Sequence, residues 1–163
     1  EVEIETPVAV AKTKVISGRK LAFVPILRAG LGMVDGVMRM VPAAKIGHIG
    51  MYRDPETHMP VEYYCKLPND IEKREIFVVD PMLATGSSME LAYEALLTKG
   101  EPAHIHIASV IASRQAIEHI KKVFPAEKTT VWCGAIDPEL NAHSYIVPGL
   151  GDAGDLCYGE KNK

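Results

Sequence analysis

Short apolar runs, separated by amphipathic and polar stretches, are the main pattern along this chain. The clearest runs are residues 21–24, 76–79, 105–111 and 129–136, in which Val, Ile, Ala and aromatic residues are frequent. Apolar runs of this length, bounded by Gly, Pro and polar residues, are typical of strands buried on both faces of a sheet. We therefore expect these runs to form the central β-strands of the fold.

Helical spacing of apolar residues follows several of these runs. It predicts helices over residues 31–40, 89–99 and 113–122, with Pro42 after the first and Gly100 after the second. Strands that alternate with helices form parallel sheets joined by right-handed crossovers. The predicted fold class is therefore α/β, with a parallel central sheet flanked by helices.

The remaining strand-like stretches are shorter or more polar. Residues 2–8 and 45–51 have strand composition, and Pro7 favours an edge position for the first. Residues 54–75 mix strand-like and polar residues and have no obvious place in the central sheet, so we interpret them as a protruding β-arm or flap. The length predicts that residues 1–163 form a single domain.

Composition and charge argue against some classes of function. A net charge of −3 provides no general basic field that would attract nucleic acid. Cys65, Cys133 and Cys157 are odd in number and lack C-x-x-C spacing, which indicates reduced thiols in a cytoplasmic protein. No apolar run approaches the ~18 residues of a membrane span. We expect a cytoplasmic protein that does not enter membranes.

The strand at residues 76–79 leads into a loop suited to phosphate. Asp80 and Pro81 end the strand, and a helical pattern begins soon after Gly86. The loop adds hydroxyl donors at Thr85, Ser87 and Ser88. A helix N-terminus attracts phosphate, and a carboxylate can accept hydrogen bonds from sugar hydroxyls. Because the loop lacks a P-loop lysine and G-x-G-x-x-G, it predicts a sugar monophosphate; an ordinary βα turn is the alternative.

Two arginines follow other predicted strands. Arg28 lies in a turn beside Ala29 and Gly30, whose small side chains leave backbone N–H groups accessible to an anion. Arginine binds phosphate oxygens in a bidentate manner, although a surface arginine beside a flexible turn is the alternative reading. Arg53 precedes Asp54 and a proline, where an isolated arginine is usually solvated.

The C-terminal run at residues 145–155 contains three glycines and two aspartates among small and apolar residues. So few side chains leave recognition to backbone N–H and C=O groups, which suit the alternating donors and acceptors on the edge of a flat pyrimidine. A glycine-rich tail without a ligand is the alternative.

The sequences of these loops resemble the motifs of one known family. D-P-M-L-A-T-G-S-S at residues 80–88 resembles the phosphoribosyl-pyrophosphate (PRPP) motif of the uracil phosphoribosyltransferases. V-P-I-L-R-A-G-L-G-M-V-D-G at residues 24–36 and M-Y-R-D at residues 51–54 resemble its pyrophosphate-binding parts, and Y-I-V-P-G-L-G-D-A-G-D at residues 145–155 resembles its uracil loop. The resemblance covers essentially the whole chain.

The resemblance implies a Rossmann-like phosphoribosyltransferase fold and transfer of the phosphoribosyl group from PRPP to uracil, giving UMP and pyrophosphate, with Mg²⁺ as cofactor. The implied PRPP-binding residues are Arg28, Ala29, Gly30, Arg53, Asp80, Pro81, Met82, Leu83, Ala84, Thr85, Gly86, Ser87, Ser88 and Asp152. The implied uracil-binding residues are Ile146, Gly151, Asp152 and Ala153. Catalytic roles would fall to Arg28, Arg53, Asp80 and Asp152, and Asp152 would also face the magnesium ion. No residue stands out as a general base.

The resemblance also implies a homodimer or higher homo-oligomer, with the arm at residues 54–75 reaching a second subunit, and it admits GTP as an effector. It implies a non-proline cis peptide in the loop around Arg28. Family members carry a further N-terminal segment of a few dozen residues, which this chain is expected to lack.

Departures from the family pattern occur at two places. Ser87 stands where the family usually has a second glycine, and residues 156–160 read L-C-Y-G-E where the family usually reads R-x-F-G-T. Serine is unfavourable at positive φ because of its Cβ, but it suits a helix N-terminus. We therefore expect Ser87 to keep a negative φ, whereas the altered C-terminal run leaves room for reduced activity.

Two rival functions stay open at this point. An RNA-binding regulator built on the same fold would need a clustered basic face, whereas the 18 Lys and Arg residues are scattered. A transferase for another nucleobase would keep the phosphate loops and differ in the base loop. Among the histidines, we interpret His104 and His106 as structural and His119 as a solvated surface residue.

Overall fold

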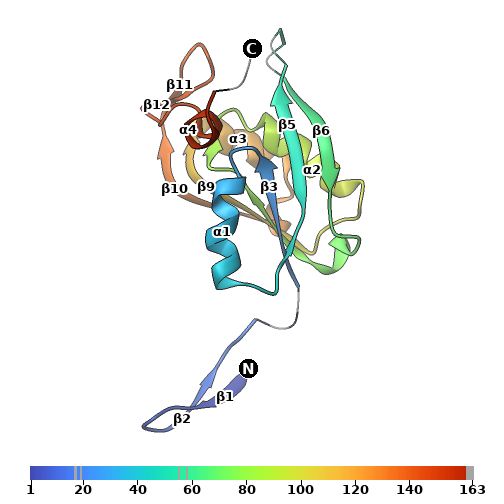
Figure 1. Ribbon diagram of the computed structural model, residues 1–163, viewed down its shortest axis with the longest axis vertical. Coiled ribbons are helices and arrows are strands. Elements are labelled where there is room, and N and C mark those ends of the chain that lie inside the picture. The colour runs from blue at the N-terminus through green and yellow to red at the C-terminus, as the bar shows by residue number, and fades with distance from the viewer. Residues whose placement is uncertain (17, 19, 55, 58, 161–163) are drawn as a thin grey trace.

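The computed structural model describes the whole chain except residues 17, 19, 55, 58 and 161–163, and the side chain of Arg53 also lies outside the description. Its centre is an eight-stranded sheet in which six strands follow the order β10-β9-β7-β3-β5-β6, while β4 also pairs with β3 and β8 with β9 (Figure 1). The strand bounds are β3 (Leu21–Leu27), β4 (Lys45–Ile46), β5 (His48–Arg53), β6 (Pro60–Lys66), β7 (Glu75–Val79), β8 (Met82–Leu83), β9 (His104–Ser113) and β10 (Thr129–Asp137). All pairs are parallel except β5–β6. The predicted α/β class is confirmed.

The connecting helices are α1 (Leu31–Met40), α2 (Ser87–Leu97) and α3 (Arg114–Val123). Figure 1 shows α1 on the near side of the sheet, with α2 and α3 behind it. The main core fills the space between the sheet and the rear helices, where Ile76 and Ile107 pack with Leu96 and Ile120. The remaining short elements are η1 (Ile71–Lys73), η2 (Ala126–Lys128), β11 (Glu139–Leu140), β12 (Ile146–Val147) and α4 (Ala153–Tyr158).

Residues 54–75 do not stand apart from the sheet in the way the sequence led us to expect. Within this stretch, β6 pairs antiparallel with β5 and forms an edge of the central sheet. Leu67 and Ile71, which follow β6, are buried in the core. The edge position gives the backbone of β6 its hydrogen-bond partners while leaving much of its side-chain surface in solvent, so the sequence carries no buried-strand pattern here.

The element that protrudes is the N-terminal hairpin of β1 (Val2–Glu5) and β2 (Val10–Thr13), where the sequence predicts one edge strand. Figure 1 shows this hairpin extending away from the sheet. The register places Ile4 opposite Ala11 on one face and Glu3 opposite Lys12 on the other. The hairpin is therefore amphipathic, yet Ile4 is 47% exposed.

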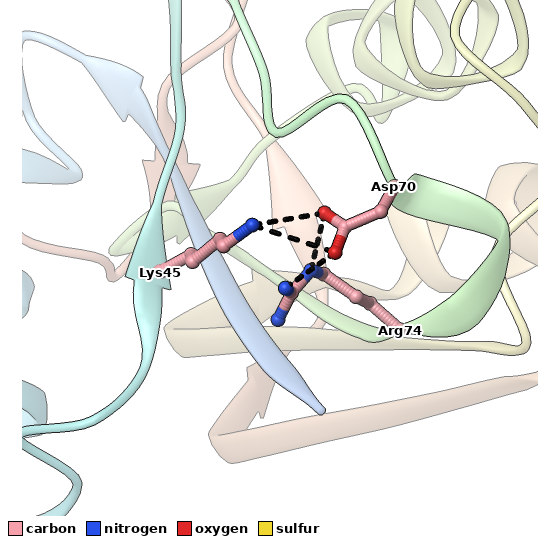
Figure 2. Close-up of polar contacts among 3 residues, drawn as sticks. All are labelled: Lys45, Asp70 and Arg74. Carbon is pink, nitrogen blue, oxygen red and sulfur yellow. Dashed lines mark hydrogen bonds and ion pairs between the residues drawn. The ribbon is translucent and has the colours of Figure 1, made fainter. Parts of the chain in front are cut away.

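An ionic cluster ties together the edge of the sheet opposite the strand carboxyl ends (Figure 2). The Arg74 guanidinium, which is buried, donates to both carboxylate oxygens of Asp70, at 2.8 Å from Nε and 2.6 Å from Nη2. Lys45 Nζ lies 3.2 Å from Asp70 Oδ1. These contacts join η1, β4 and the start of β7, and the hydrogen bonds from Arg74 hold the pKa of Asp70 far below its ordinary range.

The helices in the described part of the chain are too short or too polar to cross a membrane. The histidines of β9 have partners on β10: His104 Nε2 lies 2.9 Å from Thr130 Oγ1, and Trp132 Nε1 donates to His106 Nδ1 at 3.1 Å. These contacts fit the structural role that the sequence indicates for both histidines.

Candidate active site at the carboxyl edge of the sheet

The parallel strands β3 and β7 bring two of the predicted loops side by side. Pro25 pairs with Val79, so the loops that carry Arg28 and Asp80 leave the sheet at the same edge. Gly30 lies where these loops meet, because a Cβ at this position would come within 2.3 Å of the Val79 carbonyl oxygen. The close approach of the two backbones therefore requires glycine here.

The loop after β7 turns directly into α2. Gly86 precedes the helix with a φ of 89°, a left-handed conformation that glycine adopts without steric cost. Ser87 is the first residue of α2 and is not one of the described non-glycine residues with positive φ. Its N–H lies 3.3 Å from Thr85 Oγ1, and the two hydroxyl oxygens are 3.0 Å apart. The prediction that Ser87 keeps a negative φ is confirmed.

A small open pocket lies along this loop. Its lining residues are Asp80, Met82, Leu83, Ala84, Thr85, Gly86, Ser88 and Met89. Asp80 is fixed at one end because its N–H donates to the Ala108 carbonyl and its Oδ1 accepts the Met82 N–H, both at 3.2 Å. The N-terminus of α2 lies at the other end. The pocket therefore offers a helix terminus and hydroxyls for an anion and a carboxylate for hydroxyl groups.

Arg28 is held by the C-terminal part of the chain. The Leu27–Arg28 peptide is cis, as the family resemblance implies. Arg28 Nη2 donates to Asp155 Oδ1 at 2.7 Å, and Nη1 donates to the Gly159 carbonyl at 3.3 Å. About a third of each side chain of this ion pair is exposed, so an incoming anion can reach Arg28.

An open cavity of about 260 Å³ lies beside Arg28. Its lining residues are Leu27, Arg28, Leu31, Tyr63 and Tyr158. The Tyr63 ring covers Gly50 of β5, since a Cβ on Gly50 would come within 2.6 Å of the ring. Tyr63 thus packs against the backbone of β5.

The glycine-rich run at residues 145–155 folds into a tight loop followed by α4. Ile146 is buried and pairs with Leu140, and the Val147–Pro148 peptide is cis. Gly149 turns with a φ of 53°, and a Cβ there would come within 2.1 Å of the Ile146 carbonyl oxygen. Gly151 also has a positive φ, of 85°. The loop thus exposes backbone groups rather than side chains.

At Gly154, the glycine-rich run at residues 145–155 lies close to the loop that carries Arg28. A Cβ on Gly154 would lie 3.2 Å from Asp152 Oδ1 and 3.8 Å from both Ala29 Cβ and Arg28 Nη2. Asp152 caps α4 by accepting the Asp155 N–H at 2.9 Å. The structure therefore gathers Arg28, Ala29, Asp152 and Ala153 within one region.

The family model of uracil phosphoribosyltransferase matches residues 1–160. The chain belongs to the uracil phosphoribosyltransferase family. A uracil phosphoribosyltransferase of Alkaliphilus metalliredigens is 56% identical over 161 residues, which are 99% of this chain and 76% of that protein. One of Thermoanaerobacter sp. is also 56% identical, over 99% of this chain and 75% of that protein.

Solved structures share the fold of this chain. A protein of Aquifex aeolicus superposes with a TM-score of 0.84 at 34% identity and covers 97% of this chain and 74% of its own. A hypoxanthine-guanine phosphoribosyltransferase of Bacillus anthracis reaches a TM-score of 0.53 at 12% identity, over 76% of this chain and 69% of its own. The second likeness concerns the fold alone, which uracil phosphoribosyltransferases therefore share with transferases for purines.

Of the site residues that the family resemblance implies, Arg53 can be located only by its backbone. It ends β5, which pairs parallel with β3, so its backbone lies at the same edge as Arg28; its side chain is outside the described residues. Sequence reasoning missed the contacts of Asp155 with Arg28, because they join residues 127 positions apart.

His119 is a second residue that the sequence assigned differently. The sequence predicts a solvated side chain, whereas the structure exposes only 34% of it and pairs Nε2 with Glu90 Oε2 at 2.8 Å. A signal for this pairing exists only in three dimensions, because α2 and α3 must first pack side by side.

Proposed function

We propose that this chain transfers the phosphoribosyl group of PRPP to uracil and releases UMP and pyrophosphate. The observation that carries the proposal is the meeting of three family loops at one edge of the sheet, around Arg28, residues 80–88 and residues 146–153. Ligands of open parallel α/β sheets bind at the carboxyl ends of the strands. Membership of the family supports the same reaction.

PRPP would lie across the two loops that meet at Gly30. Its 5′-phosphate fits the N-terminus of α2, with N–H and hydroxyl donors from residues 84–88. Asp80 would accept hydrogen bonds from the ribose hydroxyls, flanked by the backbone of residues 81–83. The pyrophosphate would face Arg28, Ala29 and Gly30. Arg53, whose side chain lies outside the described part of the chain, stays a predicted pyrophosphate ligand on the family resemblance.

Uracil would lie against the loop at residues 146–153. Ile146, Gly151 and Ala153 would contact it through backbone groups, which the turns at Gly149 and Gly151 expose. Backbone donors and acceptors are fixed by the fold, so they can align the attacking nitrogen of the base with C1′ of the ribose. Loss of pyrophosphate makes C1′ cation-like, and Arg28 would stabilise the negative charge on the leaving group.

Mg²⁺ fits this arrangement as a partner of PRPP rather than as a protein-held ion. The described residues contain no group of three or more His, Cys, Asp or Glu that could hold a metal ion. Mg²⁺ commonly binds substrate phosphates, waters and one or two carboxylates, and Asp152 would supply a carboxylate here. Bound magnesium would neutralise charge on the departing pyrophosphate.

We further propose a homodimer in which the apolar face of the β1–β2 hairpin packs on a second copy. Val2 and Ile4 share that face with Ala11 and Thr13, and Val2 and Ile4 are both exposed. Apolar surface on a protruding element is typical of protein–protein contacts. The arm at residues 54–75 stays a prediction, and the hairpin at residues 2–13 is the subunit contact that we propose here. GTP as an effector and a cytoplasmic location remain predictions.

The test is a side-by-side assay with PRPP and Mg²⁺ of uracil, cytosine, hypoxanthine and guanine. We expect nucleotide formation with uracil, and its loss when EDTA removes the magnesium. Reaction with hypoxanthine or guanine but not with uracil would overturn the proposal. Binding of RNA that weakens steeply with salt, without transferase activity, would favour an RNA-binding regulator instead.

A further inference from the structure

Helix α3 touches the phosphate loop from behind at two points. The first is Ser113, the N-cap of α3, which is completely buried. Its hydroxyl donates to the carbonyl oxygen of Ala84 and accepts the N–H of Ala116 at 2.9 Å. One hydroxyl therefore joins the start of α3 to the loop that precedes α2.

The second point is His119, on the second turn of α3. Its ring lies against Gly86: a Cβ there would come within 2.9 Å of His119 Cδ2 and 3.2 Å of His119 Cβ. The far side of the ring is fixed because Nε2 bonds Glu90 Oε2 at 2.8 Å, and Glu90 lies in the first turn of α2. His119 therefore supports both the loop and the helix terminus that follows it.

These contacts flank the part of the loop that would bind phosphate. Ala84 and Gly86 are the neighbours of Thr85, and Glu90 N and Met89 N both donate to the Gly86 carbonyl, at 3.0 and 3.1 Å. A donor set binds an anion well only when its N–H groups are already aligned, since ordering them during binding lowers the affinity. Holding Ala84 and Gly86 in place keeps the donors between them aligned.

We propose that Ser113 and His119 are positioning residues that hold the phosphate loop against α3 and so set the affinity for the 5′-phosphate of PRPP. The inference rests on the proposed function. Neither side chain touches the substrate in this arrangement, because each acts from the far side of the loop backbone. Their effect should therefore fall on phosphate binding and not on the base or on the pyrophosphate.

The test compares His119→Leu, which removes the hydrogen bond to Glu90, with His119→Gln, which can restore a donor at a similar distance. Ser113→Ala removes the contact with Ala84. Gln115→Ala, an exposed position on the same helix, is the matched control. The measurements are kcat, KM for PRPP and for uracil, the melting temperature, and calorimetric binding of ribose 5-phosphate, which has the phosphate but no pyrophosphate.

We expect His119→Leu and Ser113→Ala each to raise KM for PRPP and Kd for ribose 5-phosphate about 5-fold, the effect of one hydrogen bond. KM for uracil should stay within about 2-fold, and His119→Gln should recover most of the loss. Unchanged ribose 5-phosphate affinity in His119→Leu, or an equal rise in KM for uracil, would overturn the inference. If Ser113→Ala fails to fold, the comparison of His119→Leu with His119→Gln still tests the inference.

Failure of the proposed function would be visible separately. Wild-type protein that binds ribose 5-phosphate but does not react with uracil would reject the function. The ratios of ribose 5-phosphate affinity between wild type and the His119 variants would still support or overturn the role of α3.

Discussion

At the scale of single residues, two adjacent positions in the phosphate loop have different backbone conformations and different roles in the turn. Gly86 takes the left-handed conformation, and Ser87 begins the helix with ordinary backbone geometry. The second glycine that is usual in the family is therefore not needed for the shape of this loop. The Ser87 hydroxyl instead lies beside that of Thr85, where it adds a donor near the helix terminus.

We predict that Ser87→Gly changes the affinity for PRPP by only about 3-fold, because the backbone already has the conformation that either residue adopts. Calorimetric titration of wild type and variant with PRPP and Mg²⁺ measures this. A gain of ~100-fold would show that Ser87 damages the loop.

Arg28 should carry much of the binding of pyrophosphate. We predict that Arg28→Ala lowers kcat/KM for PRPP at least ~10-fold, since a charge-assisted hydrogen bond contributes about 1.5–3 kcal/mol. Steady-state kinetics at varied PRPP concentration measures the loss. Arg39→Ala, which removes an exposed arginine from α1, is the control and should leave kcat/KM unchanged. An unchanged rate in Arg28→Ala would remove Arg28 from the site.

At the scale of elements, burial decides which parts of the fold the sequence predicts. The apolar runs gave β7, β9 and β10 nearly to their bounds, and α1 matches its predicted range. Edge elements were harder to predict, because most side chains of β6 are exposed or half-buried and its sequence therefore lacks the continuous apolar run of a central strand. Helix α4 was missed because it is short, has a glycine of poor helix propensity, Gly154, in its first turn and depends on the Asp152 cap.

The cluster of Lys45, Asp70 and Arg74 gives the fold a defined response to acid. The folded-state pKa of Asp70 is depressed, so its contribution to stability is complete above the unfolded pKa of ~3.9 and is lost as pH falls through the folded pKa. We predict that the melting temperature of wild type falls as pH drops below about 4, and that Asp70→Asn weakens this dependence.

At pH 7, Asp70→Asn should lower the melting temperature by roughly 5 °C, because it leaves the buried Arg74 without its carboxylate. The matched control is Asp35→Asn, which breaks a pair of the same i,i+4 spacing between exposed side chains. Melting curves between pH 7 and pH 3 measure both effects. Equal shifts in the two variants would contradict a special role for the buried cluster.

At the scale of the whole molecule, the sequence indicated the fold class and the sheet edge that carries the site. The sequence could not indicate which segment protrudes from the rest of the molecule. Residues 2–8 and 54–75 both have strand composition, and only the pairing in three dimensions assigns one to the sheet edge and the other to a hairpin. Contacts such as His119 with Glu90 were equally hidden, because they depend on how two helices pack.

Assembly should depend on the apolar face of that hairpin. We predict that wild type sediments as a dimer at micromolar concentration and that Ile4→Gln shifts it toward monomer, since it places an amide on the buried face of the interface. Lys12→Gln, on the opposite face of the same hairpin, is the control and should leave the mass unchanged. Analytical ultracentrifugation decides between these outcomes, and a monomeric wild type would contradict the proposed dimer.

The ion pair between Arg28 and Asp155 makes the C-terminal helix a built-in competitor of the substrate. A tethered carboxylate has a fixed effective concentration, so we expect the chain to divide between a paired and a released population before any ligand arrives. Only the released population offers the whole guanidinium to pyrophosphate. If that population were about a tenth, measured affinity would be about tenfold below what the contacts allow. Because α4 continues directly from the loop at residues 146–153, we expect release of Asp155 by PRPP to be coupled to the position of that loop.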